Sequence, residues 1–254
     1  GDPAGAARFL REARASAKVR HPNVVTVYQA DSFGTVPFIA MELLRGESLH
    51  ERLRRVGQLP LKDVLNLGRQ IALGLAAAHA QGLLHRDIKP ANIWLEQSEE
   101  GDVVAKVLDF GLARSVEGDG SLTQSGMIVG TPQYMAPEQA RGATPNIRSD
   151  LFSLGCVLYQ MTTGRLPFVG RNVLDQLRAL AVDVPPSVSE LRDNAPGELS
   201  RLIHQLLERV PATRPESATE VVERLREIAS PPVPLPVADR SIWGRRDFAA
   251  VVAI

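Results

Sequence analysis

Two short motifs constrain this chain more than any other feature: His85-Arg86-Asp87-Ile88-Lys89-Pro90-Ala91-Asn92 and Asp109-Phe110-Gly111. An aspartate such as Asp87 can accept the proton of an attacking hydroxyl group, and a nearby lysine can neutralise a moving phosphoryl group. Amide and carboxylate oxygens such as those of Asn92 and Asp109 are suitable ligands for Mg²⁺. The two motifs together therefore predict phosphoryl transfer from a magnesium-bound polyphosphate, since both rarely arise by chance on surface loops.

Over about Ala7 to Ala229 the chain resembles a bacterial serine/threonine protein kinase of the eukaryotic-like, Hanks type. The resemblance rests on further motifs in the expected order: Glu12 within a Phe-Leu-Arg-Glu-Ala-Arg stretch, His21-Pro22-Asn23, Met41-Glu42-Leu43, Gly130-Thr131, Ala136-Pro137-Glu138, Asp150 and Arg214. It implies an α+β, protein-kinase-like two-lobed fold with an incomplete β-rich small lobe and a mainly α-helical large lobe. It also implies ATP as the phosphoryl donor, Mg²⁺ or alternatively Mn²⁺ as the metal, and protein serine or threonine hydroxyl groups as acceptors.

The resemblance assigns the chemistry to four residues. Asp87 is expected to act as the catalytic base, or to orient the substrate hydroxyl, and Lys89 to neutralise charge on the γ-phosphate. Asn92 and Asp109 are expected to hold the metal ion. Lys89 and Thr131 also indicate serine/threonine rather than tyrosine specificity, because the family places this threonine against the catalytic aspartate.

The nucleotide pocket is expected at the segment between the lobes. Backbone groups of Glu42 and Leu44 are predicted to hydrogen-bond adenine, with Met41 at the back of the pocket, although the sequence alone is equally consistent with Met41 in the core. Trp94 stands where the family usually has leucine or methionine, and we expect it to form a re-shaped floor under the base. Lys89 completes the predicted ATP contacts.

Several other residues are predicted to organise the site. His85 and Phe110 are expected to pack between the lobes rather than to act as an acid or base. Asp150 is expected to hold the backbone of the catalytic loop. Glu138 and Arg214 are predicted to form a buried ion pair, which is costly to break from one side.

Residues 109–138 are rich in glycine and hydroxyl groups and resemble a kinase activation segment, which includes Gly111 of the second motif. Arg86, next to the catalytic aspartate, suggests control by phosphorylation of this segment, because an arginine can clamp a phosphate group. Thr123 and Ser125 are the candidate phosphorylation sites. Self-association of the protein for autophosphorylation would fit this form of control.

The chain is expected to divide into a partial small lobe with one helix and two strands (1–44), a large lobe (45–229), a Pro-rich juxtamembrane linker (230–244) and the start of a transmembrane helix (245–254). The arginine pair Arg245-Arg246 before an apolar run is typical of the cytoplasmic side of such a helix. We therefore expect a cytoplasmic kinase part, with a full-length parent that crosses the membrane once.

A complete kinase has a glycine-rich loop and a strand lysine before the helix that contains Glu12. Here the first lysine is Lys18, and no such loop precedes Glu12. One explanation is a fragment of an active kinase that is weakly active at best by itself; the alternative is a pseudokinase that binds partners without phosphoryl transfer. A small-molecule phosphotransferase is less favoured, because residues 130–138 resemble the protein-substrate platform of protein kinases.

Charge and cysteine content bear on nucleic-acid binding and on disulfide bonding. Lys+Arg and Asp+Glu both total 29, so the net charge gives no reason to expect nucleic-acid binding. The single cysteine, Cys156, excludes an intrachain disulfide and lies in an apolar run, which predicts a buried structural thiol.

Apolar periodicity predicts helices over residues 6–20, 61–80, 151–161, 172–180, 199–209 and 217–228, and strands over residues 24–29, 36–44 and 103–108. Capping boxes are predicted at Ser48-Glu51 and Ser217-Glu220, and Ser149 is the expected N-cap of the 151–161 helix.

Overall fold

The computed structural model describes residues 3–34, 36–97, 101–110 and 133–230. Its helices are α1 (Pro3–Ser16), α2 (Leu49–Val56), α3 (Leu61–His79), α5 (Pro137–Ala140), α6 (Ile147–Thr163), α7 (Val173–Val182), α8 (Val188–Leu191), α9 (Gly197–Leu206) and α10 (Ala218–Ala229), with 3₁₀ turns η1 (Pro90–Asn92) and η2 (Pro211–Thr213). Its strands are β1 (Val27–Phe33), β2 (Val36–Met41), β3 (Gly46–Ser48), β4 (Ile93–Gln97) and β5 (Val103–Val107). The fold is therefore α+β, as predicted.

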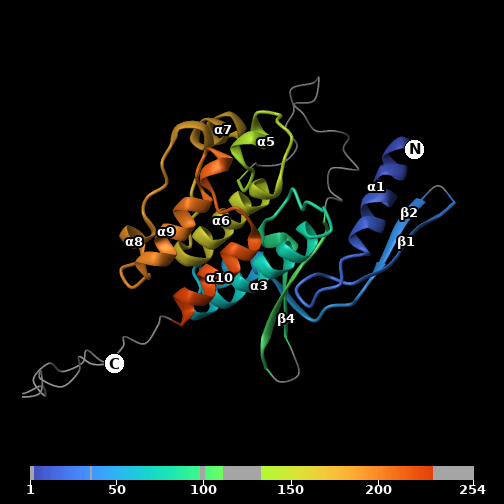
Figure 1. Ribbon diagram of the computed structural model, residues 1–254, viewed down its shortest axis with the longest axis horizontal. Helices are drawn as coiled ribbons and strands as arrows, with labels where there is room; N and C mark the ends of the chain where they lie inside the picture. The colour runs from blue at the N-terminus through green and yellow to red at the C-terminus, as the bar shows by residue number, and fades with distance from the viewer. Residues whose placement is uncertain (1–2, 35, 98–100, 111–132, 231–254) are drawn as a thin grey trace, which may run out of the picture.

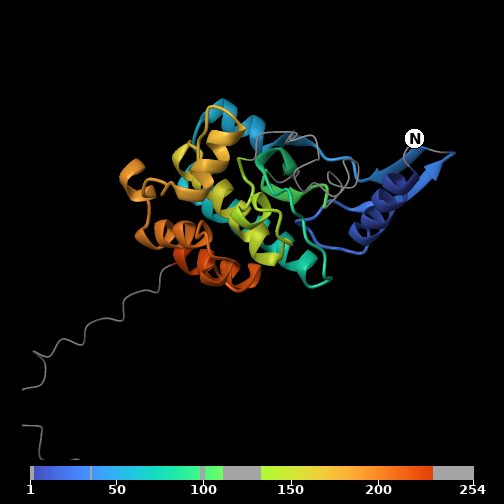
Figure 2. The same cartoon turned by 90° about the horizontal axis from the view of Figure 1, so that it is seen from above.

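The smaller part consists of α1 and the antiparallel β1–β2 hairpin, which pack against each other at one end of the molecule (Figure 1). Viewed from above, this part projects away from the helical part (Figure 2). The hairpin leaves large apolar side chains in solvent, including Phe33 at 86% and Tyr28 at 68% exposure. In the described residues β1 and β2 pair only with each other, so the two-stranded sheet keeps open edges and an uncovered apolar face.

Helix α1 ends at Ser16, four residues before the predicted end at residue 20. The chain leaves the helix through two i→i−3 hydrogen bonds, from Lys18 N to Ala15 O and from Val19 N to Ser16 O. This tighter turn places Val19 in the core, where it is 4% exposed. Burial of this apolar side chain thus overrides the continued helical periodicity.

The first strand begins later than the sequence indicates. Val24, predicted to open it, instead forms an isolated bridge to Val107 of β5, and Val25 N donates to Val107 O at 3.0 Å. The prediction of a strand over residues 24–29 was therefore wrong in its start, because these residues are drawn to the sheet of the larger part. The strand then continues to Phe33, beyond the predicted end at residue 29.

The link between the two parts depends on Asn23. Its Nδ2 donates to Gln70 Oε1 at 3.0 Å and to Ala105 O at 2.9 Å, and the Asn23 side chain is buried. Its backbone oxygen accepts from Val107 N at 2.9 Å. A Cβ added at Gly74 of α3 would lie 2.6 Å from this oxygen, so the close approach requires glycine at that position.

The larger part is built around α3, which packs against α10, α6 and β5, and around α6, which packs against α9 (Figure 1). Nearly every residue of α6 is buried, as its apolar pattern predicted. Cys156 on this helix is fully buried, and burial raises the pKa of its thiol, so the prediction of a structural cysteine is confirmed. The three-stranded sheet, in the order β3-β4-β5, lies against α3.

Two predicted details at helix ends need correction or completion. Helix α6 begins at Ile147, and Asn146 rather than Ser149 is its N-cap, accepting from Arg148 N at 2.8 Å. Ser149 lies at the third helical position, where its Oγ accepts from Asn146 N at 3.1 Å. The capping box at Ser48-Glu51 is confirmed. At Ser217 the serine cap is present, but the predicted reciprocal bond is absent, because the Glu220 carboxylate accepts from Glu216 N at 2.7 Å.

His204 of α9 is half-buried against the Tyr159 ring, with 6.4 Å between the ring centroids. Burial lowers the pKa of His204. Among the described residues, no helix is both long and apolar enough to cross a membrane, and residues 245–254 lie outside the described ranges.

Candidate active site

The loop between α3 and β4 carries the first motif, and its backbone takes an unusual course. Arg86 has a φ of 67° and Asp109 a φ of 50°, both in the left-handed region that non-glycine residues rarely occupy. Each such residue costs on the order of 1–3 kcal/mol and persists only where its surroundings hold it in place. Both positions belong to the predicted site, so the local structure must be held from outside the loop.

Asp150, on the buried helix α6, holds this loop. Its Oδ2 accepts from His85 N at 2.9 Å, and its Oδ1 accepts from Arg86 N at 2.7 Å. His79 of α3 lies on the other side, with its Nε2 2.8 Å from Asp150 Oδ2. A charged acceptor that takes up two successive loop amides can stabilise the left-handed turn at Arg86.

The loop brings Asp87, Lys89 and Asn92 together. Lys89 Nζ lies 2.6 Å from Asp87 Oδ2. Asn92 Nδ2 donates to Asp87 O at 2.8 Å and to Asp87 Oδ2 at 3.1 Å. The Asp87 carboxylate is therefore oriented by an amide donor and an ammonium group, and remains about a third exposed.

The second motif lies against the first. Leu108 N donates to Asn92 O at 2.9 Å, and His85 Nε2 lies 2.7 Å from Leu108 O. The rings of His85 and Phe110 pack with 4.8 Å between centroids, and both residues are fully buried. Asp109, between Leu108 and Phe110, is thus placed next to the catalytic loop. Burial lowers the pKa of His85, and this effect outweighs the opposing effect of Asp150. His85 therefore packs in the site as a neutral side chain.

The donor set suits a hard divalent cation. The Asn92 amide directs its nitrogen toward Asp87, so Oδ1, on the other side of the amide carbon, points away from that residue. Asp109 adds a carboxylate on the adjoining segment. Oxygen donors of these two kinds are those that Mg²⁺ accepts beside phosphate oxygens and water.

Residues 42–45 connect β2 to β3 outside any strand, with backbone hydrogen bonds at both ends, from Glu42 N to Thr26 O and from Gln97 N to Arg45 O. Met41, at the end of β2, is 40% exposed, so the alternative that places it in the core is wrong. Leu44 is partly buried. The Glu42 side chain extends to Lys106 of β5, with its two carboxylate oxygens both 2.9 Å from Lys106 Nζ. Trp94 lies on β4 directly opposite Lys106 in the strand register.

Glu12 of α1 has a partner that the sequence did not indicate. Its Oε1 lies 3.8 Å from Arg86 Nη1, and the Glu12 and Arg86 side chains are 19% and 39% exposed. Its Oε2 is buried and makes no hydrogen bond to any described residue. An arginine of the catalytic loop thus contacts the glutamate that the resemblance would pair with a lysine.

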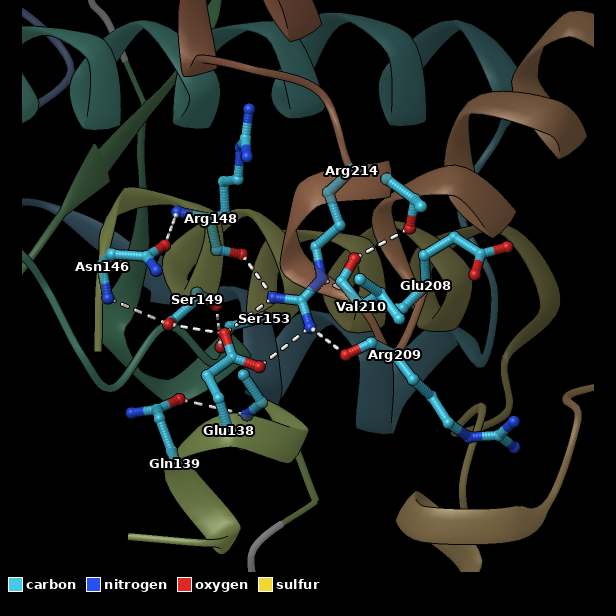
Figure 3. A network of polar contacts seen from close by, with 12 residues as sticks. Glu138, Gln139, Asn146, Arg148, Ser149, Ser153, Glu208, Arg209, Val210 and Arg214 are labelled. Atoms are coloured by element: carbon cyan, nitrogen blue, oxygen red, sulfur yellow. Dashed lines mark hydrogen bonds and ion pairs between the residues drawn. The ribbon is translucent and has the colours of Figure 1, made fainter. Parts of the chain in front are cut away.

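Glu138 of α5 and Arg214 at the end of η2 form a bidentate ion pair, with Nη1–Oε1 at 2.8 Å and Nη2–Oε2 at 2.9 Å (Figure 3). Ser149 Oγ donates to Glu138 Oε1 at 2.7 Å. Burial alone raises the pKa of Glu138, but the hydrogen bonds from Arg214 and Ser149 outweigh it and hold the pKa below its ordinary value. Neighbouring Gln139 donates through Nε2 to Arg86 O at 3.1 Å, which ties α5 to the catalytic loop.

Gly111, Thr123, Ser125 and Thr131 lie outside the described residues.

The sequence model of the protein kinase domain matches residues 2–225. This chain belongs to the protein kinase family. It is 42% identical over 231 residues to serine/threonine-protein kinase pkn2 of Myxococcus xanthus, with 87% of this chain and 27% of the relative covered. It is 40% identical over 230 residues to serine/threonine-protein kinase PknL of Mycobacterium tuberculosis, with 90% of this chain and 56% of the relative covered.

A third relative, serine/threonine-protein kinase PknB of Mycobacterium leprae, is 34% identical over 249 residues, with 94% of this chain and 39% of the relative covered. The chain thus spans between about a quarter and somewhat more than half of the length of these curated relatives. Membership of the kinase family implies that ATP is a substrate and that a divalent metal ion accompanies its phosphates.

Sequence reasoning missed three residues of this kinase site. His79 belongs to no recognised motif, yet its Nε2 lies 2.8 Å from Asp150 Oδ2. Gln139 and Lys106 were not singled out, although they contact the catalytic loop and the interlobe segment. For Lys106 a signal existed: it is the single cation in an otherwise apolar strand, which often marks a specific partner.

Proposed function

We propose that this chain is the catalytic part of a serine/threonine protein kinase that transfers the γ-phosphoryl group of ATP to protein serine and threonine hydroxyl groups. The observation that carries the proposal is the cluster of Asp87, Lys89 and Asn92 on one loop. Lys89 Nζ lies 2.6 Å from Asp87 Oδ2, and Asn92 Nδ2 lies 3.1 Å from the same oxygen. A non-catalytic module has no need of a carboxylate held between a cation and an amide.

Each residue of the cluster has a separate task. Asp87 accepts a hydrogen bond from the substrate hydroxyl, orients its oxygen and receives its proton. Lys89 stabilises negative charge on the transferred group. Asn92 and Asp109 would hold Mg²⁺, or Mn²⁺ in its place, and a bound ion would supply positive charge beside the phosphate oxygens. Catalysis on such a site is mainly positioning and electrostatic stabilisation.

The acceptor is a serine or threonine. Lys89 on the catalytic loop and Thr131 in the segment before α5 support this choice, and the relatives carry serine/threonine-protein kinase in their names. ATP binds through the backbone of Glu42 and Leu44, with Met41 at the back and Trp94 as the floor. Thr131 lies outside the described residues.

Regulation acts through Arg86. This arginine contacts Glu12 in the structure, and a phosphate on Thr123 or Ser125 competes for it with nearly two negative charges. Two copies of the kinase phosphorylate each other on this segment. Mass spectrometry of the purified, ATP-treated protein tests this point, and modification only at sites outside residues 109–138 would contradict it.

The domain limits predicted from the sequence apply to the larger parent protein. Residues 1–44 belong to a small lobe, residues 45–229 form the large lobe, and residues 230–244 lead to a membrane anchor that begins near residue 245. The kinase part is cytoplasmic. Fractionation of cells that express the full-length protein, with and without residues from 231 onward, tests the anchor. An unchanged membrane fraction after truncation would refute it.

The decisive test is transfer of labelled phosphate from ATP to a generic protein substrate by the full-length protein that contains this chain. Asp87→Asn and Asp109→Asn are each expected to lower kcat by at least ~100-fold. The control is Asp193→Asn, the same chemical change on an exposed turn between α8 and α9. Near-normal turnover of either site variant would refute the role assigned to that residue, whereas no transfer by the wild-type protein would favour the pseudokinase alternative.

A further inference from the structure

The segment between β2 and β3 has to be held in place without strand pairing, although the proposed function requires it to present backbone groups to adenine. Residues 42–45 form no ladder with any strand, and Leu43 is 94% exposed. An unpaired, solvated backbone can take many conformations, and the ordering of each residue costs about 1–2 kcal/mol. Backbone hydrogen bonds hold the two ends of the segment, from Glu42 N to Thr26 O at 3.0 Å and from Gln97 N to Arg45 O at 3.2 Å. Side-chain contacts can add to this order between the two ends.

Glu42 makes those contacts on two sides. On one side Thr26 N donates to Glu42 Oε1 at 2.7 Å, and Glu42 N donates to Thr26 O at 3.0 Å. On the other side Lys106 Nζ lies 2.9 Å from both carboxylate oxygens. The two side chains are 19% and 12% exposed, so solvent screens this pair less than a surface ion pair.

The position of Lys106 is set by the sheet. Ala105 and Val107, its neighbours on β5, are fully buried in the core, so Lys106 projects from the opposite face of the strand. Trp94 lies directly opposite it on β4, on the same face. The ammonium group of Lys106 is also 3.6 Å from Glu96 Oε2, on that face.

The direction of the Glu42 pKa shift is consistent with this geometry. Burial alone raises the pKa of Glu42, but the hydrogen bonds from Lys106 and Thr26 outweigh burial and hold the pKa below its ordinary value. Glu42 is thus a carboxylate at neutral pH with three close donor contacts. The remaining charged neighbour, Glu96, is farther from Lys106 and more exposed.

We propose that Lys106 is a positioning residue for the adenine ring, which acts through the Glu42 carboxylate to fix the backbone of residues 42–44. The proposal rests on the proposed function, because it assumes that this segment binds adenine. Lys106 touches no reacting group in this view. Its loss weakens the recognition of the base and leaves the phosphoryl-transfer chemistry intact.

The test is steady-state kinetics of the full-length protein with Lys106→Met. We expect the KM for ATP to rise about tenfold, in line with the loss of a charge-assisted contact, while kcat stays within about twofold because Asp87 and Lys89 are unaltered. Inhibition by adenosine should weaken by a similar factor. Inhibition by inorganic tripolyphosphate should not change, since it uses no contact of the adenine segment.

Two further variants keep the test decisive. Glu96→Gln removes the more distant partner of Lys106 and should leave the KM for ATP unchanged, whereas Lys106→Arg should restore most of the affinity. If Lys106→Met unfolds the protein, Glu42→Gln keeps the lysine and should give the same split between KM and kcat. An unchanged KM for ATP overturns the proposal. A rise in kcat also overturns it, because it would show that the Glu42–Lys106 pair slows turnover.

Failure of the inference and failure of the proposed function have different signatures. If the wild-type protein turns over ATP and Lys106→Met has the wild-type KM, the inference alone is wrong. If the wild-type protein shows neither turnover nor adenosine-sensitive nucleotide binding, the proposed function is wrong, and the inference falls with it.

Discussion

Replacement of Arg214 should be the most destabilising single change at a charged residue of the large lobe. Arg214 is 2% exposed, and acceptors surround its guanidinium group. They are both oxygens of Glu138 and the backbone oxygens of Arg148 at 2.8 Å, Glu208 at 2.7 Å and Arg209 at 3.3 Å (Figure 3). It also lies 4.9 Å from the centre of the Phe152 ring. Removal therefore leaves a buried carboxylate and several carbonyl groups without a donor.

The magnitude follows from the buried carboxylate. Removal of one partner of a buried ion pair costs about 3–5 kcal/mol, which is a large share of the roughly 5–15 kcal/mol that stabilises a typical domain. With a urea slope of about 3 kcal/mol per M, the unfolding midpoint of Arg214→Met should fall by about 1–1.7 M. Far-UV circular dichroism of this chain in urea measures that midpoint.

Two comparisons make the result specific. Arg226→Met removes an exposed pair with Glu223 and should cost under about 1 kcal/mol. The double variant Glu138→Gln/Arg214→Met should be more stable than Arg214→Met, because a buried neutral amide is cheaper to leave unpaired than a carboxylate. A loss below about 1 kcal/mol for Arg214→Met, or a double variant no more stable than the single one, would refute this reasoning.

Two other predictions concern acid stability and the nucleotide pocket. The folded-state pKa of Glu138 lies below its unfolded value, so this residue contributes stability that is present above about pH 4.3 and is lost as the pH falls through the folded pKa. Urea midpoints measured from pH 7 to pH 3 should therefore fall more steeply for the wild type than for Glu138→Gln; parallel curves would contradict the assignment. For Trp94→Leu we expect weaker binding of ADP by titration calorimetry on the full-length protein, by several-fold because base stacking on an aromatic ring is worth about 1–3 kcal/mol, and an unchanged affinity would exclude Trp94 as the floor of the pocket.

The Glu12–Arg86 contact shows why a motif does not reveal its own partners. The sequence places Glu12 on a helix and Arg86 beside the catalytic aspartate, 74 positions apart by their numbers, with no local pattern that connects them. The contact arises only because α1 lies next to the catalytic loop in space. The same limitation applies to Lys106 and Glu42, whose pairing depends on the course of the segment between β2 and β3.

Element ends differ for a related reason. The end of α1 and the start of β1 were misplaced because Val19 and Val24 are drawn into contacts with the larger part, which no window of local periodicity contains. The N-cap of α6 was misplaced because Asn146 and Ser149 are both good capping residues, and the choice between them depends on Ser149 donating to Glu138 of α5. Tertiary contacts thus selected between local alternatives of similar free energy.

What the sequence determined by itself is the family, through an ordered set of carboxylates, amide and cation at fixed spacing, together with most of the helices, through their apolar periodicity. Those features are local, so they can be read along the chain. Only the tertiary structure decided which charged groups face one another, namely Asp150 with His79 and the loop amides, and Lys106 with Glu42. The physical reason is that burial makes such pairings strong and selective, and burial is a property of the packed fold rather than of any segment.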